Sequence, residues 1–293
     1  MMADVLVANC VLMEADYCVV PDGWLNLTLG DQVRIAVERE VALFTVSHFS
    51  PKRNNDDDGA EEQIQLNAKQ RLGITASTFT ATLHGPVVVN LELETEQEAE
   101  AQGEFIERII DRQSRVICIA PHGGRIDLGS DLQAEFVARK LDASAWICKG
   151  YRPGGGAFTS WHVTSNDISP NSFPGLRVLA TNQTFDLCLS FHGMQEGGVL
   201  VGGLAPLEWK QRLRDLIEEH INNREGFNLD PVSVKVATLE DACNGLSKRN
   251  VCNWLTKLGR GGIQLEQDKY TRETYAQEVA QAVVEFAQTL QYD

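Results

Sequence analysis

The chain contains 293 residues, and 43% of them are hydrophobic, so it is long enough to bury one large core or two of ordinary size. Its formal net charge is −15; residues 1–104 hold 6 Lys and Arg against 18 Asp and Glu, whereas residues 105–293 hold 20 against 23. Neither part has the basic surface that binding to phosphate groups requires, which argues against a nucleic-acid-binding protein.

The apolar segments and the cysteines predict where in the cell the protein is located. No apolar run approaches the roughly 20 residues of a membrane span, and the N-terminal sequence MMADVLVANC lacks the basic and apolar regions of a signal peptide. The seven cysteines include no CxxC pair, and Cys118, Cys148 and Cys188 lie inside apolar runs, as small buried hydrophobic residues do. We therefore expect a cytoplasmic protein without a disulfide framework and without membrane contact.

The first hundred residues contain short apolar runs of alternating pattern, such as WLNLTLG, QVRIAVE and PVVVNLELE, separated by turn residues. This pattern predicts a small β-barrel or β-sandwich. The polar run RNNDDDGAEEQ at 53–63 predicts a solvated loop. The acidic stretch at 94–104 predicts the domain boundary, as a linker or as the exposed start of a helix that continues through FIERIIDRQ. We therefore expect a β domain at 1–104 and a second domain at 105–293.

From residue 105 onward, buried strands alternate with amphipathic helices. The strands are expected at 115–120, 144–150, 185–193, 197–203, 232–237 and 261–267. The helices are expected at 130–141, with Ser130 or Asp131 as the N-cap, at 206–223 and at 272–290. Continuous apolar strands that alternate with helices predict an α/β domain with a mostly parallel sheet and helices on both faces.

Polar residues follow three of the predicted strands. His122, His192 and Glu266 each lie at a strand end, and Asp127 lies in the loop after the first. In α/β sheets, ligands gather at the carboxyl ends of the strands. Each residue alone has an ordinary explanation as a turn, cap or strand-end residue. Together, two imidazoles and a carboxylate match a catalytic zinc shell with one position left for water, and a further carboxylate could take the proton of that water.

Five blocks of the sequence resemble the phage-type poly-γ-glutamate hydrolases, whose catalytic domain is similar to a small zinc carboxypeptidase. The blocks are APHGGRIDLGSDLQAEFVARKL, SWHVTSNDI, LCLSFHGMQEGGVLVGGL, NVCNW and GRGGIQLEQDKYTR, and they span about residues 105–293. The resemblance implies one Zn²⁺ ion per chain, held by His122, Asp127 and His192. It implies Glu266 as the general base. It also implies that Arg272 orients a substrate carboxylate or stabilises the developing oxyanion.

The sequence departs from the family pattern at the presumed metal site. The metal-binding acid of the family is usually glutamate, so the shorter Asp127 requires its loop to come closer to the ion. Arg125, in the triplet RID, replaces a more glycine-rich stretch and is expected beside the metal site, either contacting an anionic substrate or pointing to solvent. The resemblance and the need to bind carboxylates add these expected substrate-binding residues: Arg152, His162, Asn250, Asn253 and Arg260.

The resemblance implies a zinc-dependent hydrolase that cleaves γ-glutamyl amide bonds in an anionic peptide or polyglutamate. Two alternatives stay open: a zinc carboxypeptidase or deacylase that acts on another N-acyl substrate, and a non-catalytic binding protein that keeps the fold. The β domain is expected to lie away from the cleft, because its negative charge would oppose a polyanion, and to be available for an interaction. If the chain is of phage origin, lysis would bring it to a polymer outside the cell.

Overall fold

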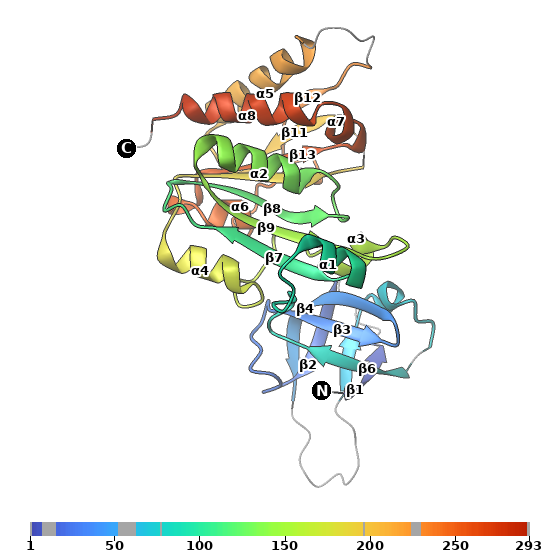
Figure 1. Ribbon diagram of the computed structural model, residues 1–293. Coiled ribbons are helices and arrows are strands. Elements are labelled where there is room, and N and C mark those ends of the chain that lie inside the picture. The colour runs from blue at the N-terminus through green and yellow to red at the C-terminus, as the bar shows by residue number, and fades with distance from the viewer. Residues whose placement is uncertain are drawn as a thin grey trace, which may run out of the picture.

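The computed structural model describes residues 2–7, 16–51, 63–76, 78–195, 197–223 and 230–291. Figure 1 shows a small barrel at the N-terminal end of the chain and a helix-flanked sheet built from the remainder. This architecture confirms the predicted fold class, an α/β unit preceded by a small all-β unit. The solvated loop predicted at 53–63 lies outside the described residues, except for Gln63, where a strand begins.

The barrel is closed, with the strand order β1-β5-β2-β4-β3-β6. Its strands are β1 (Met2–Val7), β2 (Tyr17–Pro21), β3 (Gln32–Val37), β4 (Glu40–Ser50), β5 (Gln63–Leu66) and β6 (Thr78–His84). A short 3₁₀ helix, η1 (Lys69–Leu72), follows β5. Alternate side chains such as Val33, Ile35 and Phe44 point inward and form an apolar core of their own, as expected for small barrels.

The second sheet has seven strands in the order β12-β11-β13-β10-β8-β9-β7. They are β7 (Phe105–Ile110), β8 (Val116–Gly124), β9 (Ser144–Gly150), β10 (Leu187–Gly193), β11 (Val199–Gly202), β12 (Val234–Val236) and β13 (Gly262–Gln267). The four central strands β13, β10, β8 and β9 are parallel, whereas β7 and β11 run antiparallel to their neighbours β9 and β13. The centre of the sheet is therefore parallel, as predicted, and its edges are mixed.

Helices cover both faces of this sheet (Figure 1). The helices are α1 (Glu96–Gln102), α2 (Ser130–Leu141), α3 (Ala157–Trp161), α4 (Pro174–Asn182), α5 (Leu207–Asn222), α6 (Val251–Trp254), α7 (Lys269–Thr274) and α8 (Ala276–Gln288). The long helices α2, α5 and α8 enclose one core on one face. A second core under α3, α4 and α6 also includes Leu43, Val88 and Val89 from the N-terminal part of the chain. No helix of the described segments has the length and apolar content that a membrane span requires.

Two local predictions are wrong. The acidic helix α1 does not continue through FIERIIDRQ, because Gly103 adopts a left-handed conformation (φ 72°) that ends it, and the next residues form β7. Helix α2 begins after Gly129 rather than after Ser130 or Asp131, and neither side chain caps it. The division of the chain at residue 104 into two domains stays a prediction.

A buried lysine connects the helices to the sheet beside the strand ends. Lys149 on β9 is 1% exposed, and its Nζ lies 2.6 Å from Glu96 on α1 and 3.2 Å and 2.7 Å from Asp131 and Glu135 on α2. Burial by itself would lower the pKa of Lys149, but the hydrogen bonds to Glu135 and Glu96 and the charge of Asp131 outweigh it and raise that pKa. The ammonium therefore stays charged and fixes the first turns of α2.

We expect Lys149→Met to lower the free energy of unfolding by about 3 kcal/mol. The three carboxylates around the ammonium would lose their cation, and one of them, that of Asp131, would stay buried. Urea denaturation followed by circular dichroism measures the change. The control is Lys140→Met, an exposed position on α2, with an expected effect of about 0.5 kcal/mol or less. Equal stability of the two variants would show that the cluster contributes no more than a surface charge.

Candidate functional site

The strand register brings three polar side chains to one edge of the sheet. His192 at the end of β10 lies directly opposite Glu266 on the parallel strand β13. His122 lies near the end of β8, which pairs with the other side of β10. Asp127 comes from the short turn after β8, and its backbone N–H donates to the carbonyl of His122 at 2.7 Å. That closed turn brings the shorter aspartate back to the histidines, as the predicted metal site requires.

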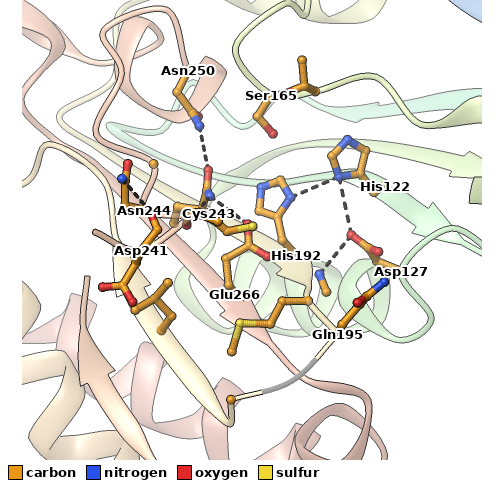
Figure 2. A pocket seen from close by; sticks show the side chains of 18 of the residues that line it. His122, Asp127, Ser165, His192, Gln195, Asp241, Cys243, Asn244, Asn250 and Glu266 are labelled. Carbon is orange, nitrogen blue, oxygen red and sulfur yellow. Dashed lines mark hydrogen bonds and ion pairs between the residues drawn. The ribbon is translucent and has the colours of Figure 1, made fainter. Parts of the chain in front are cut away.

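His122, Asp127 and His192 present their donor atoms to one another (Figure 2). Nδ1 of His122 lies 3.1 Å from Nδ1 of His192 and 3.5 Å from Oδ2 of Asp127. One donor atom from each of the three residues lies within 4.8 Å of the others, and all three side chains are buried. Two imidazole nitrogens and one carboxylate oxygen at such distances are a donor set that a divalent metal ion would fit.

Further hydrogen bonds orient the three side chains. Nε2 of His122 lies 2.8 Å from the carbonyl oxygen of Val163, which only accepts, so Nε2 carries the proton and Nδ1 keeps its lone pair. Nε2 of His192 lies 2.6 Å from the hydroxyl of Ser190, and the Gly193 N–H donates to Oδ2 of Asp127 at 2.9 Å. Such outer partners fix the orientation of metal ligands, so the site fits a bound cation.

The protonation states of the presumed ligands also favour metal binding. Burial lowers the pKa of His192 to about 3, and the nearby His122 adds to this effect, so the imidazole is neutral. Burial by itself would raise the pKa of Asp127, but its interaction with the His122 ring and the hydrogen bond from the Gly193 N–H outweigh burial and lower the pKa. Neutral imidazole and ionised carboxylate are the forms that bind metal. In contrast, burial and the charge of Asp127 raise the pKa of Glu266 well above its usual range.

The backbone of the glycine after each histidine lies very close to neighbouring groups. A Cβ at Gly123 would lie 2.5 Å from Cβ of Asp131 and 2.7 Å from the Cys148 carbonyl oxygen. A Cβ at Gly193 would lie 2.6 Å from Cζ of Arg272, because the guanidinium lies against the bare backbone. Gly123 therefore leaves no room for a side chain, whereas a side chain at Gly193 would displace the guanidinium of Arg272.

Arg272 connects two loops beside the ligands. Its Nη1 donates to the carbonyl of Leu128 at 2.7 Å, directly after Asp127, and its Nε donates to the Gln267 carbonyl at 3.2 Å. The side chain also lines the cavity in which the ligands lie. Arg272 is therefore held beside the presumed metal site with part of its guanidinium facing the cavity.

The cavity has a volume of about 880 Å³. Of the predicted site residues, it brings together these: His122, Asp127, His162, His192, Asn250, Glu266 and Arg272. Sequence reasoning missed Gln264, whose Nε2 donates to Glu266 at 2.8 Å and whose Oε1 accepts from Asn250 at 2.8 Å. Residues two apart on a strand share a face, so the spacing of Gln264 and Glu266 was a readable signal.

Four predicted substrate-binding residues lie elsewhere. Arg125 is not beside the metal ligands, because it turns to Glu100 on α1 at 2.7 Å. Arg152 pairs with Glu40 of the barrel and donates to Ser160 at 2.8 Å. Arg260 is exposed and lies outside the residues that line the cavity, and Asn253 is buried, where it donates to the carbonyls of Gly245 and Ser247 at 2.7 Å. A direct contact with substrate stays a prediction for these four, and the geometry favours structural roles.

A family model matches most of the chain, and solved structures are similar to it at low sequence identity. The family described as poly-gamma-glutamate hydrolase matches residues 91–289. A bacteriophage poly-gamma-glutamate hydrolase structure is similar with a TM-score of 0.49 and 22% identity, over 63% of this chain and 88% of that chain. A metallo-carboxypeptidase from Pseudomonas aeruginosa, in complex with (2-guanidinoethylmercapto)succinic acid, is similar with a TM-score of 0.39 and 13% identity, over 90% of this chain and 82% of that chain. No curated protein matches the sequence.

We expect the purified protein to bind a divalent ion and His192→Ala to lose most of that binding, because one of three converging donors is removed. Zinc titration against a chromogenic chelator and elemental analysis after dialysis measure the change. His220→Ala is the control, because His220 lies on α5 next to Glu285 and outside the donor set. Wild-type zinc affinity in the His192 variant would contradict this donor set.

Proposed function

Because the chain belongs to the poly-gamma-glutamate hydrolase family and is a metal-dependent hydrolase, we propose that it cleaves γ-glutamyl amide bonds of poly-γ-glutamate or a related γ-linked peptide. The observation that carries this proposal is the convergence of His122, Asp127 and His192, with Glu266 beside them, in one cavity of about 880 Å³. A cavity of that size accepts several residues of a peptide chain.

The proposed metal is one zinc ion per chain. Two imidazoles and one carboxylate are a usual set of protein ligands in catalytic zinc sites, with the fourth position open for water or substrate. Harder cations such as Mg²⁺ and Ca²⁺ prefer oxygen ligands, so the two histidines favour zinc. When bound, zinc would polarise the scissile carbonyl and lower the pKa of a water molecule towards about 7.

Glu266 is the proposed general base. It lies opposite the ligand His192 on the neighbouring strand, lines the cavity, and receives a hydrogen bond from Gln264 at 2.8 Å. Burial and the charge of Asp127 raise its pKa, which makes its carboxylate a better proton acceptor. Glu266 would remove a proton from the attacking water and deliver it to the nitrogen of the leaving amine.

Arg272 is the proposed partner of a substrate carboxylate. Each residue of a γ-linked polyglutamate carries a free carboxylate, and a guanidinium can bind it with two hydrogen bonds. Two hydrogen bonds to backbone carbonyls and the contact with Gly193 hold the guanidinium in position before substrate arrives. Lys235 also lines the cavity, but its ammonium is paired with the carboxylate of Asp241 at 2.6 Å. We therefore assign the main electrostatic contact to Arg272.

We expect Glu266→Gln to lower kcat at least about 100-fold while zinc stays bound, because the amide cannot accept a proton but can still accept the hydrogen bond from Gln264. Release of new amino groups from poly-γ-glutamate measures kcat, and elemental analysis measures zinc. Glu218→Gln, an exposed position on α5 that does not line the cavity, should keep wild-type kcat. Retention of most activity in the Glu266 variant would overturn its assignment as the base.

We expect Arg272→Met to raise KM for poly-γ-glutamate about 10- to 100-fold, the loss that a charged hydrogen bond of about 1.5–3 kcal/mol implies. Gly193→Ala should raise KM in the same direction, because its methyl group would displace the guanidinium without removing it. Steady-state kinetics separates the two effects on KM and kcat. A lower kcat with unchanged KM would instead indicate that Arg272 stabilises the oxyanion.

Product analysis tests the substrate itself. Zinc-loaded protein is incubated with poly-γ-glutamate, with α-linked polyglutamate and with a short N-acyl amino acid, and the products are separated by mass. Shortening of the γ-linked polymer alone supports the proposal. Cleavage of only the N-acyl compound would favour a deacylase, and no cleavage of any of the three would favour a binding protein.

A further inference from the structure

One wall of the cavity is formed by a segment with little regular structure. Residues 157–172 contain the short helix α3 and then continue without a strand to α4. Phe158 and His162 from this segment line the cavity. The ring of His162 packs on the ligand His122 with centroids 4.3 Å apart, and Phe158 stacks on His162 at the same distance. The position of this segment therefore determines both the shape of the cavity and the surroundings of the ligand His122.

The same segment orients that ligand directly. The carbonyl of Val163 is the acceptor of the Nε2–H of His122 at 2.8 Å, and this hydrogen bond leaves Nδ1 of His122 for the metal. A carbonyl in an irregular segment keeps its place only if other groups hold the backbone on both sides of it. The question is which part of the molecule supplies those groups.

The barrel supplies them at the far end of the segment. Gln32 on β3 is buried; its Nε2 donates to the Asp167 carbonyl at 2.6 Å, and its Oε1 accepts from the Ser169 N–H at 3.0 Å. The Ser169 hydroxyl donates to Asp31 at 2.8 Å, and the Tyr17 hydroxyl donates to the Asp167 carboxylate at 2.6 Å. Three barrel side chains thus bind the segment within a few residues of Val163.

Arg71 of the barrel holds the end nearest the metal ligands. From the 3₁₀ helix η1, its Nε donates to the Thr159 carbonyl at 2.7 Å and its Nη2 donates to the His162 carbonyl at 3.1 Å. Its Nη1 donates to the Leu43 carbonyl on β4 at 2.5 Å and lies 2.9 Å from Asp16, which anchors the guanidinium in the barrel. The charge also lies at the C-terminal end of α3, where a cation is favoured.

We propose that the barrel is part of the catalytic unit and that Arg71 is a positioning residue for the metal site. Arg71 fixes the carbonyls of Thr159 and His162, and thereby the next carbonyl, that of Val163, which orients His122. No barrel residue lines the cavity within the described part of the chain, so the barrel acts through this segment and not by touching substrate. This role differs from the interaction with another molecule that the sequence suggested for the β domain.

The test compares three variants of the full chain. Arg71→Ala removes every hydrogen bond of the guanidinium, and Arg71→Lys keeps the charge but cannot reach three carbonyls at once. Arg34→Ala is the matched control. Arg34 also joins the barrel to the rest of the chain, through Glu104 at 2.7 Å, and its guanidinium lies 4.8 Å from the ring centroid of Trp161 in the same segment. Within the described residues it donates to no carbonyl of that segment. Urea unfolding gives the stability of each variant.

Zinc affinity, measured by competition with a chromogenic chelator, is the main readout, because it depends on neither substrate nor turnover. We expect Arg71→Ala to weaken zinc binding about 3- to 10-fold, less than the 10- to 100-fold that loss of an outer partner itself causes, because the Val163 carbonyl is displaced and not removed. Arg71→Lys should weaken it less, and Arg34→Ala should stay within about twofold of wild type. With poly-γ-glutamate, kcat should fall more than KM rises in the Arg71 variants. The kinetic part rests on the proposed function; the zinc part does not.

Two results would overturn the proposal. One is wild-type zinc affinity in folded Arg71→Ala, or, if that variant does not fold, in Arg71→Lys. The other is an equal loss of zinc affinity in Arg34→Ala and Arg71→Ala, which would indicate only a general loosening of the contact between the barrel and the sheet. If the wild type binds zinc but does not cleave poly-γ-glutamate, the proposed substrate fails while the role of Arg71 is still decided by zinc affinity.

Discussion

The parallel pairing of β8, β10 and β13 is the constraint on which the site depends. Parallel strands end at the same edge, so a residue placed at the end of each meets its counterparts without any long-range adjustment. The register of β10 on β13 sets His192 opposite Glu266, and a one-residue slip would turn one of the two side chains to the other face. The strands β7, β11 and β12, which complete the sheet, carry none of the three presumed metal ligands.

Much of this edge could be predicted from the sequence. Strand ends are visible as apolar runs that stop, and His122, His192 and Glu266 each follow such a stop, so their meeting follows from the rule for α/β sheets. Asp127 was accessible through its spacing from His122. The positions of Arg125 and Arg152 were not, because a long flexible side chain takes the nearest carboxylate, and the carboxylates of Glu100 and Glu40 come from elements whose positions the sequence does not reveal.

Backbone acceptors were also hidden from the sequence. The carbonyl of Val163 has the same chemistry as any other carbonyl, so its contact with His122 depends only on where the segment lies. The prediction that the helix before residue 105 continues through FIERIIDRQ was wrong for a local reason. The pattern of FIERIIDRQ suits a helix or an edge strand, and the left-handed conformation of Gly103 ends the helix before it. Short apolar runs are ambiguous in this way until tertiary contacts fix them.

The second apolar core is shared between the N-terminal part of the chain and the seven-stranded sheet with its helices. Leu43, Val88 and Val89 pack in the same cluster as Trp146 and Trp161, although the family match begins only at residue 91. An apolar cluster shared in this way cannot be separated without exposing both sides to water. The portion of the chain that sequence similarity recognises is thus smaller than the portion that must fold together, and a fragment starting at residue 91 would lack part of its own interior.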